Sequence, residues 1–127
     1  MRTRTPACPA ETTLAVIGGR WKPVIVYHLL RGTMRYSELR GVIPKVTHKM
    51  LTEQLRELEE DGILTRRIYP EVPPRVQYQL TALGKTLGPL LREMCAWAKM
   101  YDGARRRPVV GLAGARETDG RPVRSTA

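Results

Sequence analysis

The hydrophobic residues in the first half of the chain recur at helical spacing, and glycines and prolines separate the recurring segments. This pattern predicts four helices, over residues 9–17, 23–31, 36–42 and 47–61. The fourth is the clearest, because Leu51, Leu55 and Leu58 form one apolar stripe behind an N-cap residue, Thr47. The first part of the chain is therefore expected to be helical.

The pattern changes after Gly62, where β-branched and aromatic residues replace the helical spacing. Residues 63–69 and 75–80 predict two strands. The prolines between them cannot continue a ladder, so residues 63–80 are expected to form a hairpin with a proline-stiffened tip.

A long helix is predicted over residues 82–101, and its apolar residues cover more than one narrow face. A domain this small cannot bury them all, so a second copy of the chain is expected to cover them. On this helix the predicted dimer-interface residues are Leu87, Leu90, Leu91, Met94, Trp97 and Tyr101.

Together the elements predict one mainly helical domain with a small β-hairpin (an α+β fold), formed by residues 8–103. Residues 1–7 are expected to be a flexible N-terminus, and residues 104–127, rich in Arg, Pro and Gly, a disordered basic tail. The short third helix, a break and the fourth helix have the order of a helix-turn-helix, and the hairpin after them has the position of a wing. The predicted fold is a winged helix-turn-helix.

The 127-residue chain has 22 Lys and Arg against 12 Asp and Glu, a formal net charge of +10. The tail holds six arginines and two acids, so the remainder is basic as well. A basic surface is expected of a protein that meets phosphates, although a basic protein without a nucleic-acid partner has the same composition.

The fourth helix predicts a surface for double-stranded DNA. With its leucine stripe facing the core, basic and polar residues lie on the other side of its first two turns. Its last turn is acidic, so only the N-terminal end is suited to the major groove. The predicted DNA-binding residues are Thr47, His48, Lys49, Thr52, Glu53 and Arg56 on this helix, Arg35 and Ser37 before it, and Arg66, Arg67 and Arg75 in the hairpin.

Other classes of function lack the residues they need. There is no Gly-rich phosphate loop, no nucleophile with a base, no cysteine or histidine spacing for a metal and no cofactor motif, so we expect no enzyme. RNA is less suitable, because its major groove is too narrow for a helix. No stretch is long enough to span a bilayer, and no secretory signal begins the chain, so a cytoplasmic protein is expected. A non-catalytic adaptor that binds other proteins through the same scaffold is the alternative function.

These segments together resemble the HxlR-type family of bacterial winged-helix regulators over residues 8–103. The resemblance rests on CPAETTLAVIGGRWKPVIVYHLL (8–30), RYSELR (35–40), IPKVTHKMLTEQLRELEEDGIL (43–64), YPEVPPRVQYQLTALGKTL (69–87) and the final helix. It implies a transcriptional regulator that reads an inverted repeat as a homodimer joined by its first and last helices, which adds Leu14 and Ile17 to the predicted dimer interface. A repressor is expected, because repression is the commoner outcome for a small dimer that blocks a promoter. The family more often begins the fourth helix with serine where this chain has His48-Lys49, so the resemblance does not predict the operator sequence.

The resemblance also draws attention to Cys8, because the same Cys-Pro pair senses oxidants or electrophiles in several relatives. Cys8 precedes a predicted helix, whose positive end would favour its thiolate. The alternative is a small apolar anchor at the dimer interface, and Cys95 is expected to be buried and inert. Trp21, Tyr27 and Trp97 suggest a small-molecule effector pocket, although core and interface packing explains them as well.

Overall fold

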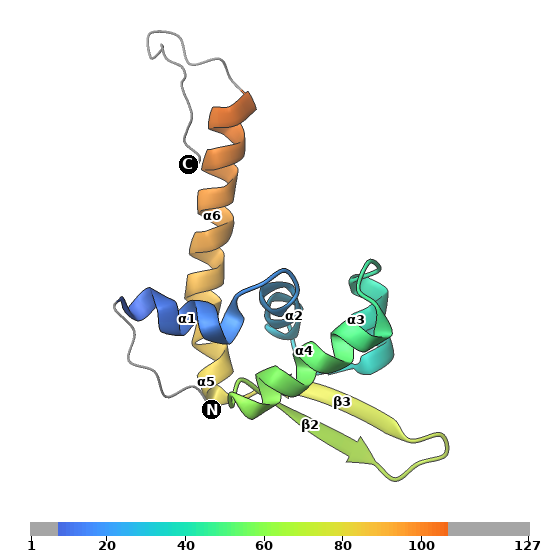
Figure 1. Ribbon diagram of the computed structural model, residues 1–127. Helices are drawn as coiled ribbons and strands as arrows, with labels where there is room; N and C mark the ends of the chain where they lie inside the picture. Colours follow the sequence, from blue (N-terminus) through green and yellow to red (C-terminus); the bar gives the residue numbers. More distant parts are fainter. Residues whose placement is uncertain (1–7, 107–127) are drawn as a thin grey trace, which may run out of the picture. The chain divides into compact units, whose positions relative to one another are not determined.

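The computed structural model describes residues 8–106 (Figure 1). Its elements are α1 (Pro9–Ile17), α2 (Lys22–Leu29), β1 (Met34–Arg35), α3 (Tyr36–Val42), α4 (His48–Glu60), β2 (Leu64–Tyr69), β3 (Arg75–Leu80), α5 (Ala82–Lys85) and α6 (Leu87–Arg106). The predicted helices and hairpin are confirmed. The chain divides into two compact units, one ending at Leu91 and the other beginning at Arg92.

Two boundaries differ from the sequence prediction. The final helix is divided at Thr86, because Pro89 has no N–H for the carbonyl of Lys85 and its ring would collide with that carbonyl. Thr86 ends α5 instead, with its own hydroxyl donating to the carbonyl oxygen of Leu83 at 2.5 Å. At its far end α6 reaches Arg106, three residues beyond the predicted limit of the domain. Residues 1–7 and the rest of the predicted tail lie outside the described residues.

The sheet has three antiparallel strands in the order β1-β3-β2. Leu64 pairs with Leu80 and Tyr69 with Arg75, so β2 and β3 form the predicted hairpin. The sequence prediction missed β1, which pairs only two residues, Met34 and Arg35, with β3. Two residues show no alternating pattern, so only the pairing with β3 reveals this strand.

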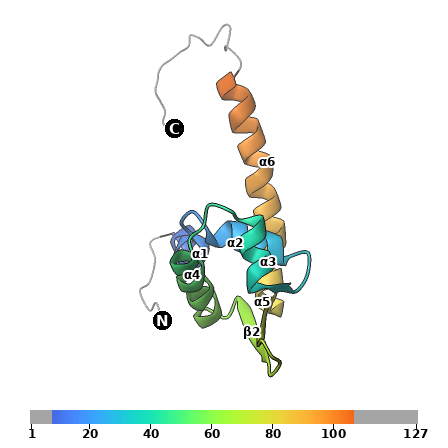
Figure 2. The same cartoon turned by 90° about the vertical axis from the view of Figure 1, so that its right-hand side faces the viewer.

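One hydrophobic core joins the helices to one face of the sheet. The leucine stripe of α4 lies at its centre, and α4 packs against β2 while α2 and α3 lie along β3. Its fully buried large side chains are Ile25, Val26, Leu39, Leu51, Leu55, Leu58 and Leu64. In Figure 2 the three helices lie on one side of the hairpin, whose tip extends beyond them. This arrangement is a winged helix-turn-helix.

An ion pair between a buried lysine and a half-exposed glutamate fastens α2 to α4. Lys22 at the start of α2 has a side chain only 6% exposed, and its Nζ lies 2.5 Å from Oε1 of Glu57. A lysine buried to this degree needs a compensating charge, because its ammonium group loses most of its hydration. Glu57, in the acidic last turn of α4, therefore has a structural role.

Candidate nucleic-acid interface

The exposed side of α4 is the surface that the leucine stripe predicts. Leu51, Leu55 and Leu58 are at most 1% exposed, so the helix cannot turn about its own axis without losing its core contacts. The side chains at the opposite positions, His48, Lys49, Glu53 and Arg56, are all exposed. The structure thus brings four of the predicted residues to one surface of the first two to three turns.

Thr47 has the predicted cap position, and its hydroxyl oxygen accepts a hydrogen bond from the backbone N–H of Met50 at 3.1 Å. Such a cap satisfies one of the free N–H groups that every helix start leaves. The hydroxyl keeps its own proton for donation. Thr47 therefore fixes where α4 begins and remains available to a ligand.

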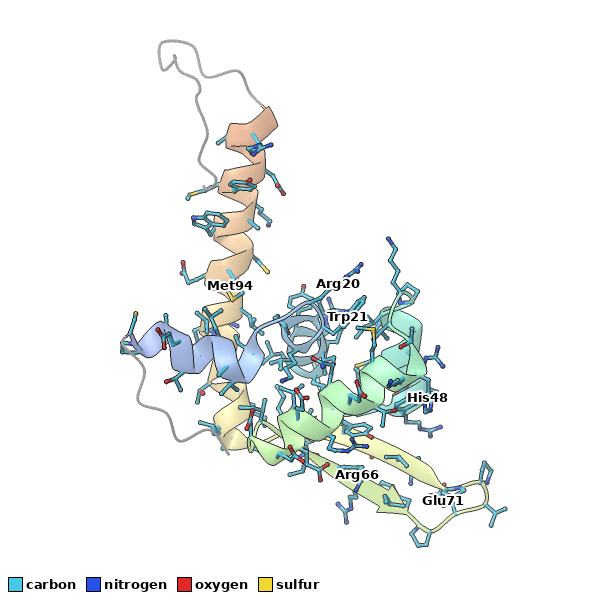
Figure 3. The ribbon with its side chains drawn as sticks, in the orientation of Figure 1. Arg20, Trp21, His48, Arg66, Glu71 and Met94 are labelled. Atoms are coloured by element: carbon cyan, nitrogen blue, oxygen red, sulfur yellow. The ribbon has the colours of Figure 1, made fainter. Side chains whose placement is uncertain are left out.

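Tyr36, which the sequence analysis did not select, connects α3 to the start of α4. Its hydroxyl donates to the carbonyl oxygen of His48 at 3.2 Å and lies 3.3 Å from Oγ1 of Thr52. The rings of Tyr36 and His48 pack with centroids 5.2 Å apart (Figure 3 labels His48 at this end of α4). Thr52, predicted to face DNA, is half-buried beneath this contact. A tyrosine at the start of a helix carries no signal for such a role in sequence alone.

We expect Tyr36→Phe to weaken binding to the specific site about threefold to tenfold, because one modest hydrogen-bonded contact with α4 is lost. Binding to random DNA should change little, since no cation is removed. Fluorescence anisotropy with both DNAs measures the ratio of specific to random affinity, and Tyr27→Phe, at an exposed tyrosine of α2, is the matched control. Equal losses on the two DNAs would contradict a role of Tyr36 in orienting α4.

The acidic end of α4 is engaged within the protein. Glu57 pairs with Lys22, and Oε1 of Glu59 lies 3.9 Å from Nε of Arg66 on β2. Arg66 also hydrogen-bonds the hydroxyl of Tyr78; burial raises the pKa of this tyrosine, while Arg66 acts in the opposite direction. These carboxylates therefore balance cations of the protein itself.

The three hairpin arginines have different surroundings. Arg66 lies on the side of the sheet that faces α4, beside Glu59 (Figure 3). Arg75 is held within the hairpin, with its Nη2 2.7 Å from Oε2 of Glu71 and its guanidinium 3.9 Å from the ring centroid of Tyr69. Arg67 has no carboxylate within ion-pair distance among residues 8–106. The expectation that Arg66 and Arg67 point to opposite faces is confirmed by the register, in which they pair with Tyr78 and Gln77.

The remaining predicted DNA-binding residues, Arg35 and Ser37, are exposed at the start of α3. The backbone N–H of Arg35 donates to Oε1 of Glu38 at 2.7 Å, which fixes the first turn of α3. The hairpin tip between β2 and β3 presents Val72 fully exposed.

The predicted dimer-interface residues divide into two groups. Ile17 and Leu91 are buried in the core of the single chain, at 2% and 4% exposure, and Leu87 packs against that core. They are core residues, because each faces the interior of its own unit, and assigning Ile17 and Leu91 to a partner surface was wrong. The exposed ones are Leu14, Leu90, Met94, Trp97 and Tyr101, with Trp97 stacked on Tyr101 at 5.2 Å.

Both cysteines are exposed thiols. Cys8 stands at the N-cap of α1, as predicted, but Cys95 on α6 was wrongly expected to be buried, because the apolar neighbours that suggested burial are themselves exposed in the single chain. Trp21 belongs to the core, with the guanidinium of Arg20 4.5 Å from its ring centroid (Figure 3 labels both residues). Tyr27 is exposed. The effector pocket stays a prediction.

Within residues 8–106, no group of three or more His, Cys, Asp or Glu side chains is placed to hold a metal ion. The helices of the same region are too short or too polar to cross a bilayer.

Comparison with known proteins gives one family. Residues 16–106 match the family described as HxlR-like helix-turn-helix. The chain is 51% identical over 94 residues to the uncharacterised HTH-type transcriptional regulator YdeP of Bacillus subtilis, covering 74% of this chain and 73% of YdeP.

Similar solved structures lead to the same class of protein. The redox regulator HypR in its reduced form is 45% identical with a TM-score of 0.74, over 78% of this chain and 98% of HypR. Diamide-treated YodB from B. subtilis is 39% identical with a TM-score of 0.63, over 74% of this chain and 94% of YodB. The chain therefore belongs to the HxlR-like helix-turn-helix family of transcriptional regulators.

Proposed function

We propose that the protein is a homodimeric, sequence-specific DNA-binding regulator without catalytic activity, which represses by occupying a promoter. The proposal is carried by one observation: the first turns of α4 expose Lys49 and Arg56 opposite a leucine stripe that is completely buried. A helix held in this way offers a fixed set of donors to the major groove.

Each predicted contact has a role that suits its chemistry. Lys49 and Arg56 bind phosphates or guanine edges, Thr52 and His48 meet base edges, and Glu53 accepts from a cytosine amino group. Thr47, Arg35 and Ser37 bind the phosphates beside the groove. The hairpin acts as the wing, through Arg67 and, more weakly, through Arg66 and Arg75, whose charges are shared with nearby glutamates.

The exposed apolar residues of α6 support a dimer. Leu90, Met94, Trp97 and Tyr101 follow one another at steps of three and four residues, the spacing of a single helix face. A contiguous apolar face of this kind is typical of a subunit interface. A twofold dimer presents two α4 helices, so the operator is an inverted repeat with half-sites about one helical turn apart.

A gel shift with the DNA upstream of the protein's own gene tests the proposal. Specific binding is expected, with an affinity that falls steeply as salt rises, because each neutralised phosphate releases counterions. A scrambled fragment of equal length is the control. No preference for the promoter fragment, or an affinity that salt does not change, would contradict the proposal and favour a protein-interaction adaptor.

Regulation by thiol chemistry is the second part of the proposal. The similar proteins HypR and YodB are described as a redox regulator and as diamide-treated, and Cys8 of this chain is an exposed thiol at a helix N-terminus. Oxidants, electrophiles or a small effector acting there would change the DNA affinity of the dimer.

We expect diamide, which joins two thiols as a disulfide, to lower the DNA affinity of the wild type several-fold and to leave Cys8→Ser unaffected. Cys95 is the only other cysteine, so the disulfide joins Cys8 to Cys95 or to a second Cys8. Cys95→Ser distinguishes these pairings on a non-reducing gel. A full response to diamide in Cys8→Ser would exclude Cys8 as the sensor.

A further inference from the structure

The face of the sheet that points away from the core carries a second cluster of polar side chains. Side chains alternate between the two faces of a strand, and Leu64, Tyr78 and Leu80 are buried in the core. The register therefore places Thr65 beside Gln79, and Arg67 beside Gln77, on the other face. Arg35 of β1 pairs with Gln77 from the opposite side. Arg35, Gln77 and Arg67 thus form one row across three strands.

A hollow of about 290 Å³ opens on this outer face. It is lined by Thr33, Thr65, Arg67, Tyr69, Gln77 and Gln79. The lining offers a guanidinium group, two amides and three hydroxyls, and it contains no carboxylate. Such a set of donors suits an oxygen anion.

The charge of Arg67 in this row is not balanced by an acid of the described residues. Two arginines stand on either side of the neutral Gln77, about 10 Å apart because neighbouring strands are about 4.8 Å apart. The guanidinium of Arg67 contacts the ring of Tyr69, at 5.3 Å, and no acid of the described residues pairs with it. Arg66 and Arg75, by contrast, each lie beside a glutamate. Arg67 is therefore the cation of the hairpin that is free to bind an anion.

Part of the lining is already held in place by contacts within the protein. The hydroxyl of Thr33 donates to Oε1 of Gln79 at 3.3 Å, which leaves the amide NH₂ of Gln79 as a donor. Tyr69 lies between the guanidinium groups of Arg67 and Arg75, and Arg75 is in turn held by Glu71. These contacts reduce the side-chain entropy that binding would cost.

We propose that the outer face of the sheet is an anion-binding site, in which Arg67 holds a phosphate or carboxylate group by paired hydrogen bonds and Gln77, Gln79 and Thr65 supply further donors. The anion is a free small molecule. A phosphate of the DNA backbone at the same side chains would be no more than the wing contact already proposed for Arg67, and the test separates the two. The site lies on the opposite face of the sheet from α4, so its occupation does not compete with the buried leucine stripe or the first turns of that helix.

The first arm of the test uses the full chain without DNA, titrated with sodium phosphate and with citrate at constant ionic strength. NMR of the glutamine side-chain amides follows the binding. A free ligand predicts a saturable shift with a Kd on the order of 1 mM. Arg67→Gln should weaken it about tenfold or more, because charge-assisted bonds are lost, while Arg66→Gln on the same strand keeps it. Equal binding by Arg67→Gln would overturn the proposal.

The second arm measures the salt dependence of binding to operator duplexes with long flanks. If Arg67 binds only a backbone phosphate, the first arm shows no saturable shift, and Arg67→Gln lowers the slope of log K against log salt by about 0.9 while Lys85→Gln, an exposed cation of α5, does not. That result would overturn the free-anion site and leave only the wing contact. If neither arm distinguishes Arg67→Gln from its control variant, the outer face is no anion site. The first arm needs no DNA, so its result stands apart from that of the proposed function.

Discussion

Replacing both Lys49 and Arg56 by alanine is expected to weaken operator binding about a hundredfold, with folding intact. Each side chain is exposed on α4, and neither forms an ion pair within residues 8–106, so its removal leaves no buried group without a partner. A phosphate or guanine contact of each is worth roughly 1–3 kcal/mol. The slope of log K against log salt should fall by about one to two units in anisotropy titrations.

The control for this variant is Lys85→Ala, which removes an exposed cation from α5, at the opposite end of the domain from the start of α4 (Figure 1). It should bind the operator like the wild type. Circular dichroism and thermal unfolding check that all variants fold. Operator affinity that the double variant keeps would show that another face of α4, or another element, meets the DNA.

Replacing Gly84 by alanine is expected to lower the free energy of unfolding by about 2–3 kcal/mol. An added Cβ would lie closer than 3.0 Å to the backbone carbonyl oxygen of Ile63 and 3.2 Å from Cδ2 of Leu80. The carbonyl cannot move easily, because it accepts hydrogen bonds from the backbone N–H of Thr81, at 3.0 Å, and from its hydroxyl, at 3.1 Å. Thermal unfolding should show a midpoint lower by on the order of 10 °C.

Gly41→Ala is the matched control for Gly84→Ala. Gly41 is also a helical glycine, on α3, but an added Cβ there meets nothing within 4 Å. Alanine restricts the unfolded chain, so this variant should be unchanged or stabilised by up to about 1 kcal/mol. Both are measured at equal protein concentration, because a dimer's stability depends on it. Similar midpoints for the two variants would mean that α5 shifts away from Ile63 at little cost.

Features set by local periodicity could be predicted from the sequence. The leucine stripe and Thr47 located α4 and its start to the residue, and the prolines of the hairpin located its tip. The same stripe decides which side of α4 is exposed, so the candidate DNA surface followed from it. Arg66 and Arg67 were correctly assigned to opposite faces, because alternation along a strand does not depend on distant contacts.

Features set by contacts between distant segments could not be predicted from the sequence. Met34–Arg35 is a strand only because β3 lies beside it, and Tyr36 matters only because α4 starts within reach of its hydroxyl. Lys22 and Glu57 are 35 positions apart, so nothing local indicates that they pair. The division of the last helix had a local signal in Pro89. The prediction still joined the two parts, because the apolar spacing continues on both sides of this proline.

The ion pair between Lys22 and Glu57 has a consequence for how the regulator can be handled. Mobile ions screen charges that stand in water far more than charges enclosed by protein. In this pair the Lys22 side chain is 6% exposed and the Glu57 side chain 46% exposed, so its screening lies between the two cases. A salt step that strips the protein from a heparin or DNA column should therefore weaken this ion pair less than a surface pair, while the apolar core shared by α2 and α4 holds the two helices together. The eluted protein would be ready to rebind after simple dilution, without a refolding step.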